Sequence, residues 1–259
     1  MGGIFLREVP IKSILFLTLS VLNFSSFAYT HFKGDKSWSD LKTQLQEKRE
    51  YRDLVGLDNK SLKEKLGKIA ASGYRSLSYD QARLIMFTII DNVDGEVCSV
   101  YSNHECIITY EIPNNQVMNA EHTWPKSLGA GTVPAKSDLH HLYPTTNHAN
   151  SVRSSLPFCE VVRSDWENDG SRRGVDGDDH HCFEPPAYHR GNVARSLFYF
   201  AIRYGHSIDD KDEEVLRKWH HEDPVTDQDI ERNEKIKSYQ RNSNPFVDIP
   251  DLVDMVDNF

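Results

Sequence analysis

The chain has 259 residues, of which 38% are hydrophobic and 27% are charged, and its formal net charge at pH 7 is −9. This length and composition are typical of one large globular domain or two small ones. The acidic balance excludes a protein that coats nucleic acid through its overall charge, because non-specific affinity for polyphosphate comes mostly from positive residues.

The amino end has the features of a secretory signal peptide. Arg7 and Lys12 precede an apolar run over residues 14–24, and small residues suited to cleavage follow just before Ala28. The run is too short for a comfortable membrane span, and no later stretch is apolar enough to cross a bilayer. We therefore predict a signal peptide over residues 1–28, cleavage near Ala28, and a secreted or periplasmic mature chain without a membrane segment.

All four cysteines lie in the predicted mature chain. In an oxidising compartment an even number of cysteines predicts disulfides, and four cysteines allow three connectivities. We favour Cys98–Cys106 and Cys159–Cys182, because each pair closes a short polar loop. A zinc cluster is the alternative, but no Cys-x-x-Cys spacing supports it.

The first part of the mature chain is predicted to be helical. An arm and a charged helix occupy residues 29–53, and a short helix follows over residues 61–70. Ser78 and Gln81 form a capping box, and apolar residues recur at helical spacing behind it as far as Ile90. This pattern predicts an amphipathic helix in the core.

Short strands and loops are predicted in the middle of the chain. Residues 107–110 have strand composition, and a second short strand ends at Pro144. Loops are expected over residues 91–103, 129–137 and 165–179. The last loop ends in an acidic stretch that resembles part of a calcium loop but lacks the spacing of an EF-hand.

A short helix is predicted after the second strand. Thr145 or Thr146 caps it, and Asn147, Asn150 and Arg153 then share one helical face.

The carboxy-terminal part is predicted to be mainly helical. Residues 183–186 open a helix whose apolar stripe runs over residues 193–202. A further helix ends before Pro224, and Thr226 caps a charged one. Residues 242–250 are predicted to be an extended latch. Because there is no repeat and no low-complexity linker, we predict one mainly helical α+β domain with a small sheet.

Glu121 and His122 are the residues with the clearest chemical meaning. A carboxylate is a hard oxygen ligand suited to Mg²⁺, and a neutral imidazole can take a proton from water. One group for the cation and one for the proton is the minimum equipment for metal-assisted hydrolysis. The alternative interpretation is a surface glutamate beside a packed histidine.

The basic residues between Ser137 and Asp210 are all arginines, seven in number, although lysine is plentiful elsewhere. Arginine binds phosphate and carboxylate in a bidentate manner better than lysine does. The pattern therefore favours phosphate contacts, and the alternative is a set of buried ion pairs. We expect one such pair between Glu184 and Arg195.

Five motifs occur in an order that resembles the endonuclease I family of secreted and periplasmic nucleases, which carry a ββα-metal (His-Me finger) active site. The resemblance covers roughly residues 54–249, and it implies a nuclease domain over 54–250 followed by a tail over 251–259. The motifs are Glu121-His122-Thr123-Trp124-Pro125, Asp138-Leu139-His140-His141-Leu142-Tyr143-Pro144, Asn150-Ser151-Val152-Arg153, Phe183-Glu184-Pro185-Pro186 with Gly191-Asn192-Val193-Ala194-Arg195, and Asn242-Ser243-Asn244-Pro245-Phe246.

The resemblance implies a monomeric, Mg²⁺-dependent enzyme that cleaves DNA, and often RNA, with little sequence preference. Carried over by position, Glu121 and Asn150 are metal ligands, His122 is the general base, and Arg153 contacts the phosphate. Cleavage would leave a 5′-phosphate and a free 3′-hydroxyl. Whether Mn²⁺ or Ca²⁺ replaces Mg²⁺ is left open. In some family members an arginine in a long insert steadies the phosphate. Here the short segment 123–137 has two lysines as its only basic residues, so no such arginine is assigned.

Other functions stay open at this point. One is a nucleic-acid-binding module of the same fold that has lost the chemistry. Another is a different secreted metallohydrolase, for example a zinc enzyme that uses His140, His141, His180 or His181, although no His-x-x-x-His helical pair is present. A third is a structural or adhesion protein.

Overall fold

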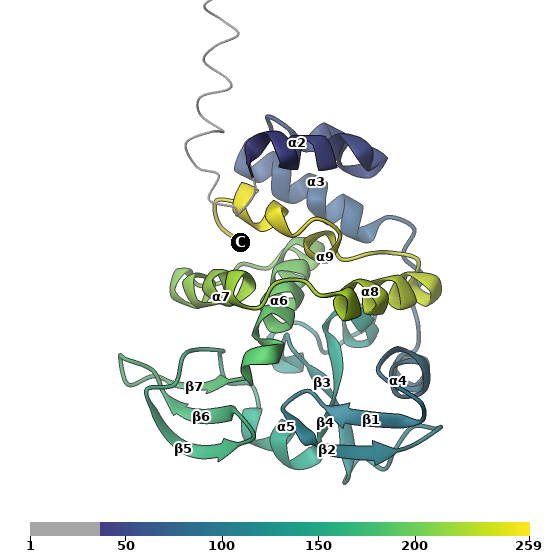
Figure 1. The fold of residues 1–259 in the computed structure, drawn as a ribbon, viewed down its shortest axis with the longest axis vertical. Helices are drawn as coiled ribbons and strands as arrows, with labels where there is room; N and C mark the ends of the chain where they lie inside the picture. Colours follow the sequence, from purple (N-terminus) through teal and green to yellow (C-terminus); the bar gives the residue numbers. More distant parts are fainter. Residues whose placement is uncertain (1–36) are drawn as a thin grey trace, which may run out of the picture.

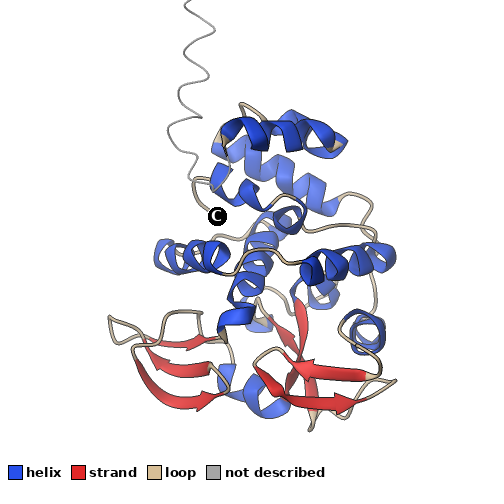
Figure 2. Cartoon of the chain, viewed as in Figure 1, coloured by secondary structure: helices blue, strands red, loops and turns tan. Residues whose placement is uncertain are grey.

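The computed structural model describes residues 37–259, so the predicted signal peptide lies outside the described residues (Figure 1). Most of the helices occupy one half of the molecule, and the strands lie together in the other half (Figure 2). The strands form three small antiparallel sheets. The prediction of a mainly helical α+β fold is confirmed. No helix within residues 37–259 is long and apolar enough to cross a bilayer.

The helices begin where polar side chains cap them. The predicted capping box of Ser78 and Gln81 is present, with Gln81 N–H donating to Ser78 Oγ at 3.2 Å. The helix that follows continues as a π-helix over Met86–Ile90. The α-helices are α2 (Trp38–Glu47), α3 (Asn59–Ala71), α4 (Tyr79–Ile85), α5 (Asn147–Arg153), α6 (Arg190–Tyr204), α7 (Asp210–Glu222), α8 (Asp227–Gln240) and α9 (Pro245–Asp248).

The main hydrophobic core surrounds α6, in which every residue from Val193 to Ile202 is buried. Helices α3 and α7 pack against it. Leu41 and Leu45 of α2 belong to the same core, as does Leu252 near the carboxy terminus. Segments from both ends of the described chain therefore bury their apolar side chains against one central helix.

Each of the three sheets is formed by strands that follow one another in the sequence. The first sheet contains β1 (Glu96–Ser99) and β2 (Ser102–Ile108), and the second contains β3 (Met118–His122) and β4 (Leu142–Thr146). The third contains β5 (Arg163–Asn168), β6 (Ser171–Val175) and β7 (His181–Glu184). In the second sheet Glu121 lies opposite Tyr143. The predicted strand ending at Pro144 is therefore present, and it continues to Thr146.

The predicted loops over residues 91–103 and 165–179 are wrong in part, because β1 and β6 lie within them, and β2 and β5 overlap them. Strand β5 reads Arg-Ser-Asp-Trp-Glu-Asn, which is too polar to show the alternation of a half-buried strand. Its pairing with β6 depends on Gly174, where an added Cβ would come within 2.1 Å of the Arg163 carbonyl oxygen. A close approach of two backbones is not visible in a pattern of apolar residues.

Two further predictions are wrong. Residues 183–184 do not open a helix but end β7, and the helix begins at Arg190 after a 3-10 turn. The tail over 242–250 is not wholly extended, since α9 lies within it and a 3-10 helix follows over Pro250–Met255. Both helices have a proline in their first turn, where the missing N–H costs no hydrogen bond. Asn244 caps α9 through the Phe246 N–H at 3.0 Å.

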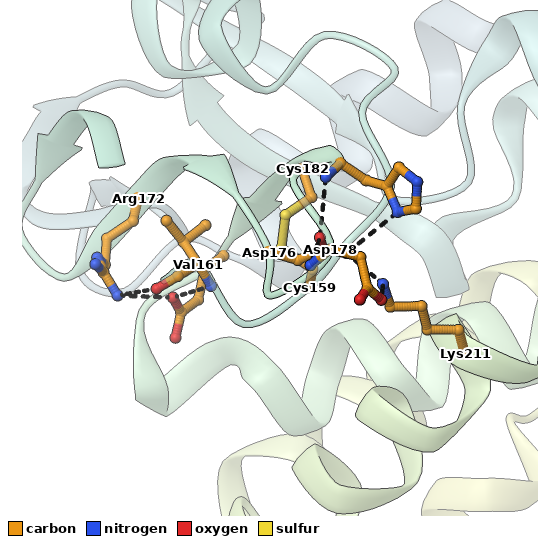
Figure 3. Close-up of a disulfide and its surroundings, with 9 residues drawn as sticks. Cys159, Val161, Arg172, Asp176, Asp178, Cys182 and Lys211 are labelled. Carbon is orange, nitrogen blue, oxygen red and sulfur yellow. Dashed lines mark hydrogen bonds and ion pairs between the residues drawn. A yellow bond between two sulfur atoms is a disulfide. The ribbon is translucent and has the colours of Figure 1, made fainter. Parts of the chain in front are cut away.

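Both favoured disulfides are present. Cys98 and Cys106 join β1 to β2 across the first sheet. Cys159 and Cys182 join β7 to the segment before β5, with Cα atoms 5.7 Å apart (Figure 3). Among the described residues there is no free cysteine.

Candidate active site

Glu121 and His122 end strand β3, and both are buried, with 1% and 5% of their surface exposed. Because successive side chains on a strand point to opposite faces, the carboxylate and the imidazole do not meet. The alternative interpretation of Glu121 as a surface glutamate is excluded by its burial.

One hydrogen bond and one ion pair hold a single oxygen of the Glu121 carboxylate. The Tyr101 hydroxyl donates to Oε1 at 2.9 Å, and the Arg153 Nε lies 3.2 Å from the same oxygen. Tyr101 is fully buried, and burial raises the pKa of its phenol well above the ordinary value, so the phenol keeps its proton and donates. No motif pointed to Tyr101; its place in the loop closed by Cys98–Cys106 is the only feature of the sequence that singles it out.

Arg153 ends α5 and is 1% exposed. Beyond its contact with Glu121, it donates to the Thr123 carbonyl at 2.7 Å and to the Ser154 carbonyl at 2.9 Å. Its guanidinium lies 4.5 Å from the centroid of the Phe158 ring. In this conformation the arginine serves protein acceptors, and a contact with a phosphate stays a prediction.

Several other arginines of the segment are also ion-paired with carboxylates. The expected pair of Glu184 and Arg195 is wrong: Glu184 contacts Arg172 and Arg190, whereas Arg195 lies 3.5 Å from Asp229. The structure thus favours buried and half-buried ion pairs as the role of much of this segment.

The contact of the His122 ring with the Lys136 carbonyl indicates which nitrogen carries the proton. The His122 Nε2 lies 3.0 Å from the Lys136 carbonyl oxygen, and a carbonyl only accepts, so Nε2 carries the proton. In the neutral ring Nδ1 then carries the lone pair. Burial, and next the positive charge that His141 would carry, lower the pKa of His122 to about 3, so the ring is neutral across the physiological range.

Asn150 lies on α5, which begins at Thr146 as predicted, with the Ala149 N–H donating to the Thr146 hydroxyl at 3.3 Å. The helix packs against both β3 and β4, and Asn150 is half-buried on it. The order of the chain through this part is strand, strand, helix. Glu121 and His122 belong to the first strand, and Asn150 belongs to the helix.

The Asp-Leu-His-His motif serves the packing of the site. Asp138 is fully buried and accepts from Tyr199 at 2.8 Å and from Tyr204 at 2.7 Å. The Nε2 atoms of His140 and His141 each lie within hydrogen-bond distance of a backbone carbonyl. Within residues 37–259 His140, His141 and His181 belong to no cluster of three metal-ligating side chains, whereas His180, the other histidine of the zinc alternative, belongs to one with Asp176 and Asp178.

The acidic stretch after β6 contains a cluster of Asp176, Asp178 and His180. Figure 3 shows Asp176 and Asp178 near the Cys159–Cys182 disulfide. The Lys211 ammonium lies 2.7 Å from an Asp176 oxygen and 2.5 Å from an Asp178 oxygen. Lys211 of α7 is thus paired with two carboxylates of the cluster, and these ion pairs join α7 to the loop that follows β6.

Comparison with known proteins places the chain among nucleases. The family model described as Endonuclease I matches residues 37–251. The extracellular ribonuclease of Bacillus subtilis (strain 168) is 32% identical over 232 residues, which are 80% of this chain and 77% of that protein. An extracellular ribonuclease of Bacillus amyloliquefaciens is equally similar over 234 residues, with the same coverage. An extracellular deoxyribonuclease of Aeromonas hydrophila is 27% identical over 118 residues, 44% of this chain and 50% of that protein.

Proposed function

The chain belongs to the Endonuclease I family, and on this premise we propose that it is a secreted, Mg²⁺-dependent endonuclease that hydrolyses phosphodiester bonds. One observation supports the proposal most. At the end of β3 the Glu121 carboxylate is fixed by a hydrogen bond and the neighbouring His122 imidazole is neutral, and the helix that carries the Asn150 amide packs against this strand. In this proposal β3, β4 and α5 form the ββα-metal unit.

Glu121 and Asn150 would hold the metal ion. A carboxylate and an amide oxygen are both hard ligands, and this donor set fits Mg²⁺ while leaving room for water and substrate oxygens. The ion, when bound, offsets negative charge on the scissile phosphate and on the leaving oxygen. Mn²⁺ has the same preference for oxygen ligands, and we expect it to replace Mg²⁺ in the reaction. Ca²⁺ also binds oxygen ligands, and we expect it to bind without supporting turnover.

His122 would act as the general base through Nδ1. Its Nε2–H is fixed by the Lys136 carbonyl, which holds the ring in one orientation and leaves the lone pair on the other nitrogen. The water that loses its proton to Nδ1 would attack phosphorus, the bond between phosphorus and the 3′ oxygen would break, and the 3′ oxygen would take a proton from solvent. The products are a 5′-phosphate and a 3′-hydroxyl.

Arg153 would act mainly by orienting Glu121, since its three nearest acceptors belong to the protein. We retain a contact with the phosphate as a second role, which requires the guanidinium to exchange one of these acceptors for a phosphate oxygen. Arginine is suited to this exchange because it presents several donors in one plane.

DNA and RNA are both proposed substrates. Two relatives that match 80% of this chain are named ribonucleases, and three that match 44% of it are named deoxyribonucleases. The extracellular or periplasmic naming of these relatives supports a secreted or periplasmic location. The mature chain is proposed to act as a monomer.

Nicking of supercoiled plasmid, with Mg²⁺ and with EDTA, tests the proposal. We expect turnover only with the metal, and loss of at least about 100-fold in rate for His122→Ala, because a positioned base contributes on that order. His104→Ala is the matched control, since its side chain is 86% exposed. Rates at the parental level for a folded His122→Ala variant would refute the base assignment. Plasmid binding without cleavage would instead support a module that has lost the chemistry.

A further inference from the structure

Tyr101 reaches Glu121 from a turn that is fixed on several sides. The turn joins β1 to β2, and the Cys98–Cys106 disulfide closes it. The Val100 N–H donates to the Pro144 carbonyl of β4 at 2.9 Å. The Ser171 hydroxyl of β6 donates to the Tyr101 carbonyl at 2.7 Å. The backbone that carries the phenol is thus attached to all three sheets.

The ring itself is equally constrained. It packs edge-on against Phe183 of β7, with centroids 4.9 Å apart, and against His189 at 6.0 Å. Tyr101 has no exposed surface. A side chain held in this way cannot adopt another rotamer without a shift of its neighbours, so its hydroxyl is a fixed donor rather than an adaptable one.

We propose that Tyr101 is a positioning residue: with Arg153 it occupies Oε1 of Glu121, and so leaves only Oε2 for a divalent cation. The phenol donates a hydrogen bond to Oε1 at 2.9 Å, and the Arg153 guanidinium forms an ion pair with the same oxygen at 3.2 Å, so a cation at Oε1 would displace the phenol proton and meet a positive charge. Coordination through both oxygens is therefore closed, and the carboxylate binds through one. This inference rests on the proposed function, because it assigns a role to the ligand named there.

The phenol also fixes the direction in which Oε2 points. Partners that orient a metal ligand commonly change metal affinity by about 10–100-fold when they are removed. Tyr101→Phe removes one oxygen and keeps the ring, so its packing against Phe183 is retained. We expect this variant to bind Mn²⁺ at least about 10-fold more weakly than the parent, since the carboxylate can then rotate.

The matched control is Tyr51→Phe. Tyr51 is also buried, and its hydroxyl donates to an Asp248 oxygen at 2.7 Å, so it loses the same kind of bond far along the chain from Glu121. Titration calorimetry with Mn²⁺ on the disulfide-intact protein gives the affinities. Glu121→Gln is measured beside them, because it removes the ligand itself.

The outcomes separate the inference from the function on which it rests. Weak binding by Tyr101→Phe, with parental binding by Tyr51→Phe, supports the inference. Parental binding by a folded Tyr101→Phe overturns it and leaves the nuclease assignment intact. If the parent and Glu121→Gln bind Mn²⁺ alike, the metal site is misassigned and the proposed function fails as well.

A spectroscopic measurement on the unchanged protein keeps the inference testable if Tyr101→Phe does not fold. The infrared carboxylate bands that shift when Mn²⁺ binds, and that Glu121→Gln removes, report how many oxygens coordinate. We expect the wide splitting of one-oxygen coordination. The narrow splitting of a carboxylate that binds through both oxygens would overturn the inference.

Discussion

Three buried histidines should make the protein sensitive to mild acid. His140, His189 and His220 are each at most 4% exposed. Burial lowers the pKa of His140 to about 4 and the pKa of each of the other two to about 3. The charges nearest to His189 and His220 are arginines and His221, which act in the same direction. Only His140 has an acidic neighbour, Asp138, which opposes the effect of burial.

The sign and the size follow from proton linkage. The folded-state pKa values lie below the ordinary 6.5, so between about pH 6.5 and pH 3 the unfolded chain binds more protons. The contribution of these histidines to the free energy of unfolding is therefore fully present above about pH 6.5, and it decreases as the pH falls below that value. Each histidine loses about 1.4 kcal/mol per pH unit, which is about 2 kcal/mol at pH 5 and about 6 kcal/mol for the three. A loss of about 6 kcal/mol is comparable with the whole free energy of unfolding of many domains.

Urea unfolding at pH 7.5 and at pH 5 measures this loss, and His220→Leu isolates one contribution. We expect the difference in free energy of unfolding between the two pH values to shrink by about 2 kcal/mol in this variant. His181→Leu, which changes an exposed histidine, is the control. If His220→Leu and the parent lose equal stability on acidification, the buried ring does not remain neutral and the reasoning is refuted.

Two further predictions concern stability. Arg153→Met should cost about 3–5 kcal/mol in urea unfolding, because it leaves the buried Glu121 charge without its cation; a cost below 1 kcal/mol would show that the carboxylate finds other compensation. Replacing Cys159 and Cys182 by serine should cost about 3 kcal/mol for a sequence separation of 23 residues. The same change at Cys98 and Cys106, with a separation of 8, should cost less, and the reverse order would contradict the loop-entropy argument.

Features that depend on neighbours in the sequence were predictable. The capping box at Ser78, and the caps at Thr146 and Thr226, are bonds from a side chain to a backbone three residues away, so the residue types reveal them. The two disulfides close loops whose ends are near in sequence. The apolar stripe of α6 was equally clear, because a single helix contains it, although the burial of the polar residues between its members was not visible in the pattern.

The third sheet could not be predicted, because its stability is not local. Strand β5 is polar along its length, and the feature that anchors it is the stacking of Trp166 on Phe183, with centroids 6.2 Å apart. The two residues are 17 positions apart by number and belong to different strands. Hydrophobic periodicity describes one segment at a time. A strand that is stabilised by a ring from another strand and by Gly174 therefore cannot be recognised from its own pattern of apolar residues.

The candidate site was predictable as a set of residue types but not as an arrangement. The motifs identified Glu121, His122 and Asn150 without indicating what surrounds them. Helical spacing placed Arg153 on the same face as Asn150, but spacing does not say how far a long side chain folds back, and the guanidinium turns into the protein. Tyr101 has no motif, since its importance depends on a contact across 20 positions of sequence.

The burial of Glu121 with Arg153 calls for a reason other than stability. A buried ion pair is often no more stable than apolar residues of the same size, so stability alone does not account for it. In the proposed function, charge balance accounts for the burial of this ion pair. Glu121 and Arg153 together carry no net charge, so a divalent cation bound by Glu121 would give the site two net positive charges. A phosphodiester attacked by hydroxide carries two negative charges. A lone glutamate would cancel one of the two positive charges and leave the transition state under-compensated. In the proposed function the arginine would thus leave the full charge of the cation to act on the phosphate, and the burial of the ion pair would limit the screening of that charge by solvent.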